Sequence, residues 1–327
     1  MDSLDIAIVG AGPTGLATAI EAQRRGLKYA VFDKGCITNS ILGFPSHMVF
    51  FTTPELLEIG GMPLISEREK PSRNEALKYY RKVVQALGLK VRQFEEVRKI
   101  EQTAVHRFRV RTAMGEYEAN NVVLATGYYD NPNMLGIPGE DLPHVSHYYT
   151  EPYSFFDRDV VIVGGKNSAA EAALDLFRGG ARVTLVHRGA EMGSTLKYWV
   201  RPDIENRFKA GEVKVFFNAH VTRITSSSVE MVQVGVSHSL RAQQVFLLTG
   251  YRSSTTFFEQ LGIQWDADTL RPQHNPETFE TNVPGVYLAG SIIGGRFNAE
   301  VFIENGRFHG ETVVKAIAGI SGIERKD

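Results

Sequence analysis

Residues 6–35 read IAIVGAGPTGLATAIEAQRRGLKYAVFDKG, and residues 160–189 read VVIVGGKNSAAEAALDLFRGGARVTLVHRG. The two stretches align without a gap, so that Gly10 meets Gly164 and two later glycines also coincide. In each copy four apolar residues precede a glycine turn, an alanine- and leucine-rich stretch follows, and a second apolar run ends the unit. Short apolar runs of this kind are typical of buried parallel strands, and self-similarity indicates one structural unit used twice. The sequence therefore predicts an α/β fold built from two strand–turn–helix–strand units.

The first copy has the complete pattern of a dinucleotide-binding turn. Gly10, Gly12 and Gly15 follow the strand and open the helix, and Asp33 ends the second strand. Such glycines permit a tight bend, a close approach to a pyrophosphate and close packing of the helix, while the acid accepts hydrogen bonds from a ribose. We therefore expect a bound dinucleotide here. The expected contacts are Gly10, Gly12, Pro13, Thr14, Gly15, Asp33 and Lys34.

The second copy departs from this pattern in two places. Lys166 replaces the middle glycine, and His187 with Arg188 stands where the first copy has its acid. A carboxylate there would repel a ribose 2′-phosphate, whereas an arginine pairs with it. This difference predicts NADPH rather than NADH, with a solvated His–Arg pair at a strand end as the alternative. The expected contacts are Gly164, Gly165, Lys166, Asn167, Ser168, Ala169, His187 and Arg188.

Length and composition exclude several classes of protein. The chain has 327 residues, 43% hydrophobic and 22% charged, which is a balance typical of globular domains. A net charge of -1 gives no electrostatic reason to expect nucleic acid or an anionic membrane as a partner. A strand pattern that starts at Ile6 leaves no room for a signal peptide, and a single cysteine, Cys36, excludes an internal disulfide. No His, Cys, Asp or Glu spacing indicates a metal site. We expect a cytoplasmic protein.

Two further segments carry a family resemblance. Residues 121–127 read NVVLATG, and residues 281–291 read TNVPGVYLAGS. With the two turns, they make the chain resemble the two-domain pyridine nucleotide–disulfide reductase superfamily, and low-molecular-weight thioredoxin reductase in architecture. The resemblance implies two Rossmann-like domains: a discontinuous FAD domain, residues 1–136 and 252–327, and an inserted NADPH domain, residues 137–251.

The same resemblance adds residues to the FAD site. It implies contacts from Thr126, Gly127, Gly290, Ser291, Val301 and Phe302. Ser291 stands where the family has an aspartate. A helix beginning at about Asn298 is expected to direct its N-terminus at the flavin, with an ordinary core helix as the alternative.

Residues 146–152, SHYYTEP, stand where thioredoxin reductases carry CxxC, so a dithiol relay is excluded. The chain resembles the bacillithiol disulfide reductase family, often called YpdA, in residues 164–169, GGKNSA; residues 51–57, FTTPELL; and residues 302–307, FIENGR. This implies an FAD-dependent NADPH oxidoreductase, a homodimer, that reduces a low-molecular-weight disulfide such as oxidised bacillithiol. The family's proposed catalytic cysteine falls at Thr14, and a hydroxyl cannot form a mixed disulfide.

The catalytic residue and the acceptor therefore stay open. Thr14 and His47 are candidates, His47 as a proton donor or as a hydrogen-bonded loop histidine. Tyr148 and Tyr149 line the flavin or pack in the core, and Cys36 is a redox group or an inert thiol. The alternative functions are a ferredoxin–NADP reductase with a small electron-carrier protein as partner, a flavin-dependent monooxygenase, and a non-catalytic redox sensor.

Overall fold

The computed structural model describes residues 3–297 and 299–321, which form two compact units. Unit 1 comprises the described residues of Met1–Leu42, Met48–Asn131 and Tyr251–Asp327. Unit 2 comprises Gly43–His47 and Pro132–Gly250.

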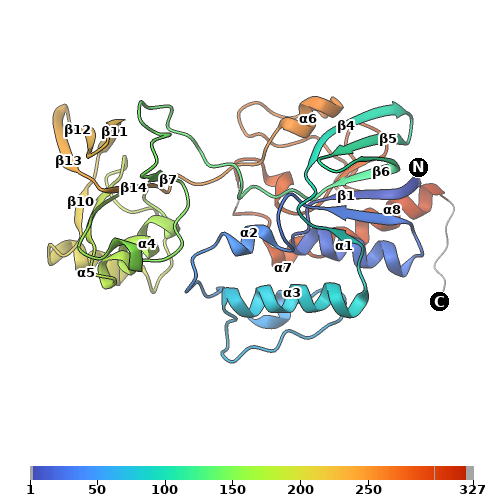
Figure 1. The fold of residues 1–327 in the computed structure, drawn as a ribbon, viewed down its shortest axis with the longest axis horizontal. Helices are drawn as coiled ribbons and strands as arrows, with labels where there is room; N and C mark the ends of the chain where they lie inside the picture. Colours follow the sequence, from blue (N-terminus) through green and yellow to red (C-terminus); the bar gives the residue numbers. More distant parts are fainter. Residues whose placement is uncertain (1–2, 298, 322–327) are drawn as a thin grey trace. The chain divides into compact units, whose positions relative to one another are not determined.

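Unit 1 is built on a seven-stranded sheet in the order β3-β2-β1-β6-β5-β4, with β15 also paired to β6 (Figure 1). Its centre is parallel: Ile8 lies opposite Val31 of β2 and opposite Val123 of β6. β4, β5 and β6 continue as an antiparallel meander. The strands are β1 (Ser3–Val9), β2 (Tyr29–Phe32), β3 (Val91–Arg92), β4 (Val97–Ala104), β5 (Arg107–Thr112), β6 (Glu116–Leu124) and β15 (Val286–Leu288).

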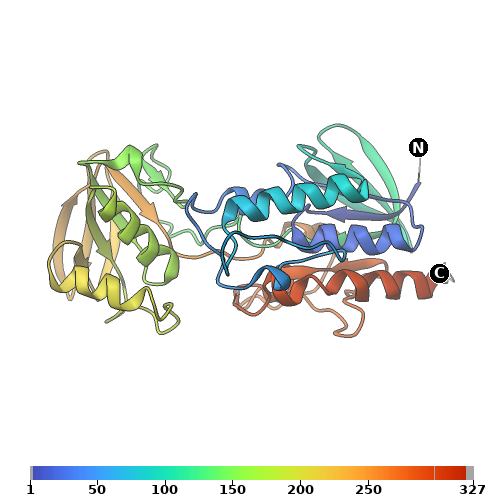
Figure 2. The same ribbon diagram turned by 90° about the horizontal axis from the view of Figure 1, so that it is seen from below.

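The helices of unit 1 are α1 (Pro13–Arg24), α2 (Asn39–Leu42), α3 (Arg73–Leu87), α6 (Thr256–Leu261), α7 (Ile303–Gly306) and α8 (His309–Ser321), with 3₁₀ turns η1 (Pro54–Leu56) and η3 (Gly290–Gly294). α1 and α8 lie side by side in both views (Figures 1 and 2). Gly310 makes this approach possible, because a Cβ there would lie 2.6 Å from the Thr18 backbone nitrogen. The first and last helices of the unit are therefore locked together.

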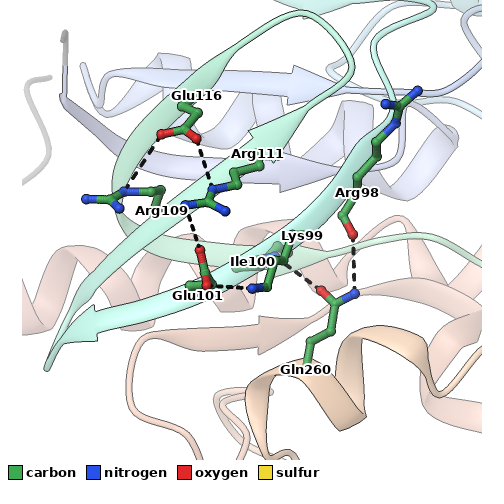
Figure 3. A network of polar contacts seen from close by, with 8 residues as sticks. All are labelled: Arg98, Lys99, Ile100, Glu101, Arg109, Arg111, Glu116 and Gln260. Carbon is green, nitrogen blue, oxygen red and sulfur yellow. Dashed lines mark hydrogen bonds and ion pairs between the residues drawn. The ribbon is translucent and has the colours of Figure 1, made fainter.

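The side chain of Gln260 covers part of the edge of this sheet at strand β4. β4 is the outer strand, and Gln260 of α6 accepts a hydrogen bond from Ile100 N–H at 3.2 Å and donates one to Arg98 C=O at 3.2 Å (Figure 3). Charged side chains cover the outer surface of the meander, where Glu101 pairs with Lys99 at 2.7 Å and with Arg111 at 3.4 Å. Exposed edges invite pairing with another chain, so both features protect β4.

Unit 2 holds a five-stranded parallel sheet in the order β10-β9-β8-β14-β7 and an antiparallel meander, β11-β12-β13. The strands are β7 (Val145–Ser146), β8 (Asp159–Val163), β9 (Arg182–Val186), β10 (Lys214–Phe216), β11 (Ala219–Ile224), β12 (Ser228–Gln233), β13 (Val236–Arg241) and β14 (Gln244–Leu247). The helices are α4 (Asn167–Arg178) and α5 (Arg201–Lys209), with the 3₁₀ turn η2 (Tyr153–Phe155). One core packs α4 and α5 on the sheet, and a second packs the meander.

The predicted α/β fold and its repeated unit are confirmed. β1–α1–β2 and β8–α4–β9 fall on the two aligned stretches of sequence. Within the described part of the chain, no helix has both the length and the apolar character needed to cross a bilayer.

The helix expected from about residue 298 begins later, and this expectation is corrected. Asn298 itself lies outside the described residues, and α7 begins only at Ile303. Phe302 is extended, with φ -111° and ψ -176°, and its N–H donates to Asn305 Oδ1 at 2.8 Å. A turn at residues 307–308 then separates α7 from α8. A side-chain cap inside the expected helix thus sets its start.

Candidate functional site

The first glycine turn is tightly packed on one side and open on the other. Gly10 has φ +110°, and a Cβ there would lie 2.4 Å from Ala125 O. A Cβ at Gly15 would lie 1.9 Å from Gly10 O, so α1 approaches β1 as closely as glycine allows. A Cβ at Gly12, by contrast, would meet nothing within 4 Å. The turn therefore presents bare backbone to open space at Gly12 alone.

The start of α1 is suited to an anion. No side chain caps this helix, and Pro13 occupies its first turn. The first N–H groups of a helix have no intrahelical partner, and they bind phosphate when the backbone is accessible. The open Gly12 and the uncapped helix together fit the pyrophosphate of a dinucleotide.

Asp33 is built into the same turn. Its Oδ2 accepts the Ala11 N–H at 2.7 Å, and its Oδ1 accepts the Gly35 N–H at 2.8 Å. Burial raises the pKa of this carboxyl group. Because each carboxylate oxygen has a second lone pair, Asp33 has the capacity to accept further hydrogen bonds. Lys34 forms an ion pair with Asp130, with Nζ and Oδ2 3.1 Å apart.

Other predicted FAD contacts belong to distant parts of the sequence but lie close to the first glycine turn. A Cβ at Gly290, which has φ +80°, would lie 2.9 Å from Thr14 Oγ1, and a Cβ at Gly306 would lie 3.2 Å from it. A Cβ at Gly127 would lie 3.6 Å from Ser291 Oγ. Thr14 is therefore enclosed by the two glycines, and the sites near residues 10, 127 and 290 converge.

Three predicted contacts lie at the rim of this cluster. Thr126 is half-buried next to the buried Ala125. Val301 is buried, and its Cγ1 would lie 3.3 Å from a Cβ at Gly306. Phe302 is exposed, and its ring packs edge-on against Phe51 at 6.0 Å.

One residue of this cluster was missed by the sequence analysis. His309 Nδ1 accepts the N–H of Gly290 at 3.1 Å. The only sequence signal is a histidine at the start of a C-terminal helix, 19 residues away from its partner. Nothing in the local pattern pairs the two.

The second glycine turn is packed in a different way. A Cβ at Gly164 would lie 2.6 Å from Leu248 O and 2.8 Å from Ala169 Cβ. A Cβ at Gly165 would lie 2.1 Å from His187 Cε1, so the imidazole occupies the space beside this glycine. Burial, followed by the charge of Arg188, lowers the pKa of His187. His187 therefore packs under the turn as a neutral ring.

Two cations remain accessible at this turn. Lys166 and Arg188 are both exposed, and neither forms an ion pair with any described residue. Lys166 is also the extended N-cap of α4, which has no side-chain cap, and Ser168 is exposed in its first turn. The arrangement can bind an anion at the helix start and a second one at the end of β9.

Asn167 has a structural task in this turn. Its Nδ2 donates to Thr195 O at 3.2 Å, and its Oδ1 accepts the Lys197 N–H at 2.9 Å. Gly193 N–H adds a hydrogen bond to Gly165 O at 2.8 Å. The loop at residues 193–197 is thereby fastened to the glycine turn.

His47, the second catalytic candidate, lies in the 43–47 segment of unit 2, whereas Thr14 lies in unit 1. Its Nδ1 is 3.3 Å from Asp175 Oδ2, and the hydroxyl of Tyr149 donates to the same carboxylate. Tyr149 is buried in the unit 2 core, edge-on to Phe246 at 5.4 Å. Of the two alternatives for Tyr149, the structure favours core packing.

Cys36 does not have the surroundings of a reactive thiol. Burial, with a contribution from Asp33, raises the pKa of its thiol. The thiolate is the reactive form, so these surroundings reduce reactivity. Over residues 3–297 and 299–321, no three His, Cys, Asp or Glu side chains gather as a metal site would require.

Comparison with known proteins places this geometry in context. Residues 7–290 match the family described as pyridine nucleotide-disulphide oxidoreductase. The chain is 44% identical over 313 residues to bacilliredoxin reductase Bdr of Bacillus subtilis (strain 168), covering 95% of this chain and 96% of that protein. It is similar to the solved structure of bacillithiol disulfide reductase Bdr (YpdA) from Bacillus cereus, with a TM-score of 0.94, 41% identity and coverage of 98% and 100%. The T. acidophilum thioredoxin reductase shares the fold, at a TM-score of 0.77 and 23% identity, with 98% and 99% covered.

Proposed function

Because the chain belongs to the pyridine nucleotide-disulphide oxidoreductase family, and within it to the Bdr (YpdA) group, we propose that it catalyses the NADPH-dependent reduction of bacillithiol disulfide. Membership makes it an NAD(P)H-dependent flavoprotein oxidoreductase, which confirms the sequence prediction of enzyme class and cofactor type. The ferredoxin reductase, monooxygenase and redox-sensor alternatives are not favoured. The observation that carries the proposal is 44% identity to a bacilliredoxin reductase over nearly the whole chain.

In this proposal FAD is bound by a discontinuous domain, residues 1–136 with 252–327, which overlaps unit 1. The open backbone at Gly12 and the uncapped start of α1 would hold its pyrophosphate, and Asp33 would accept hydrogen bonds from its ribose. Ser291 Oγ, which has no hydrogen-bond partner among the described residues, is available for a hydroxyl of the flavin side chain. When bound, FAD supplies two-electron chemistry between the nicotinamide and the acceptor.

NADPH would be bound by the inserted domain, residues 137–251, which overlaps unit 2. Lys166 and the start of α4 are available to its pyrophosphate, and Arg188 to its 2′-phosphate. His187 would have a structural role in the second glycine turn, since its neutral ring packs against Gly165. We therefore assign the preference for NADPH to Arg188 alone.

The overall reaction needs one proton as well as two electrons. NADPH, one proton and one disulfide yield NADP⁺ and two thiols, with the sulfur–sulfur bond broken. Thr14 cannot form a mixed disulfide, and the thiol of Cys36 is held protonated by its surroundings. We therefore propose that no cysteine of this chain bonds covalently to the substrate. His47 and Thr14 remain the candidates for supplying the proton.

The test is anaerobic. The purified flavoprotein is reduced with NADPH, oxidised bacillithiol is added, and flavin absorbance is followed. Rapid return of the oxidised flavin spectrum is expected, in the native protein and in a Cys36→Ser variant alike. A flavin that stays reduced with this disulfide but is oxidised by ferredoxin or oxygen would contradict the proposal. Sedimentation and cell fractionation test the homodimer and the cytoplasmic location that the proposal includes.

A further inference from the structure

The backbone N–H of Gly290 has an unusual partner. Gly290 opens η3, is buried, and adopts the left-handed conformation at φ +80°. A buried N–H group needs an acceptor, and here the acceptor is a side chain, His309 Nδ1, at 3.1 Å. A histidine ring nitrogen accepts a hydrogen bond only when it carries no proton. The turn at Gly290 therefore depends on the protonation state of one imidazole.

The imidazole is held in place by its neighbours. His309 is the first residue of α8, and Gly310 after it lies directly against the α1 backbone at Thr18. The ring stacks on Phe279, with centroids 4.3 Å apart and an interplanar angle of 21°. These contacts hold the imidazole on α8, so the hydrogen bond ties the turn at Gly290 to that helix.

His309 is neutral at physiological pH. Burial lowers its pKa to about 4, with a smaller contribution from His274. His274 stacks on the same phenyl ring at 5.8 Å, with its Nδ1 3.0 Å from Pro272 O, and among the described residues it is the titratable group whose charge acts on His309. Protonation of His309 as the pH falls towards 4 removes the acceptor and leaves Gly290 N–H unpaired.

The position of Gly290 determines what faces the first glycine turn. Gly290 lies against Thr14, and Ser291 next to it approaches Gly127. We propose that His309 is a positioning residue of the FAD site, which holds the Gly290–Ser291 turn against the first glycine turn by accepting the Gly290 N–H. This inference rests on the proposed binding of FAD in unit 1.

Two substitutions separate the hydrogen bond from the packing. His309→Phe keeps a ring that stacks on Phe279 but removes the acceptor, whereas His309→Asn loses the ring but places a carbonyl oxygen near the former Nδ1. The dissociation constant of FAD is measured by titrating apoprotein and following flavin fluorescence at pH 7. The loss of a hydrogen bond from a buried N–H predicts weakening by about ten- to a hundred-fold in His309→Phe. His309→Asn should stay within about fivefold of the native protein. His274→Phe is the matched control and should bind FAD normally at pH 7.

The dependence of FAD affinity on pH is a second measurement, and a loss of packing alone would not change it. In the native protein the pKa of His309 lies below its usual value, so the hydrogen bond is intact at neutral pH and is lost as the pH falls towards about 4. FAD affinity should fall over that range in the native protein and fall less steeply in His309→Asn, in which Asp33 still titrates but residue 309 does not. Circular dichroism of the apoprotein at each pH identifies any global unfolding.

Native FAD affinity in His309→Phe, or an unchanged acid step in His309→Asn, would overturn the inference. If His309→Phe does not fold, the acid profile of His309→Asn decides alone. The experiment contains neither NADPH nor a disulfide, so failure to reduce bacillithiol disulfide would count against the proposed function and not against the role of His309.

Discussion

The proposed preference for NADPH is assigned to one guanidinium group, and the effect of removing that group can be calculated. Arg188 lies two residues beyond β9, next to His187, which aligns with Asp33 of the first unit, and it forms no ion pair with a described residue. A charge-assisted hydrogen bond contributes roughly 1.5–3 kcal/mol, but an exposed ion pair is weakened by solvent and salt. We therefore expect Arg188→Ala to cost about 1–2 kcal/mol in the binding of NADPH, or about five- to thirty-fold. NADH has no 2′-phosphate, so its use should be unchanged.

The assay compares kcat/KM for NADPH and for NADH with one disulfide acceptor, at low and at high salt. The ratio of the two constants should fall in Arg188→Ala, and high salt should reduce the difference between variant and native protein. Arg223→Ala is the matched control, since Arg223 is an exposed arginine on β11 of the same unit and also forms no ion pair with a described residue. An unchanged ratio in Arg188→Ala, an equal fall in Arg223→Ala, or a native preference for NADH would refute the reasoning.

Three further predictions concern unit 1. Gly15→Ala places a Cβ 1.9 Å from Gly10 O, so the variant should purify without flavin; a stoichiometric ratio of flavin to protein would contradict this. Gln260→Ala leaves two backbone groups of β4 to water, and urea unfolding should show a loss of about 1 kcal/mol together with more self-association; unchanged unfolding and sedimentation would show that the edge needs no such cover. Cys36→Ser should leave turnover with bacillithiol disulfide within about twofold of the native rate, because burial disfavours the thiolate, and a tenfold fall would give Cys36 a redox role.

The sequence alone predicted those parts of the fold and of the candidate site that depend on a local pattern of residues. The two aligned stretches predicted β1–α1–β2 and β8–α4–β9, because the steric demands of a glycine turn are met by residues within the turn and its flanking strands. The crowding at Gly10 and Gly15 and the open space at Gly12 follow the three roles expected of those glycines.

Prediction failed where a residue's role depends on distant packing. His187 and Arg188 are adjacent in the turn that follows β9, yet the imidazole of His187 packs beside Gly165 while Arg188 is exposed to solvent. The start of α7 was misplaced because the amide of Asn305 caps Phe302 from within the expected helix. The bond between His309 and Gly290 joins two elements through tertiary packing, which no local periodicity records.

The convergence of early and late segments in unit 1 has a consequence for biosynthesis. β15 pairs with β6 inside the sheet, and α8 packs on α1, so the unit that begins at β1 is completed only by the last described helix. The whole of residues 132–250 is translated between these two parts. Domains fold as units while the chain is synthesised from its N-terminus. A nascent chain should therefore complete unit 2 first, and should capture its flavin only when the C-terminal helix has left the ribosome.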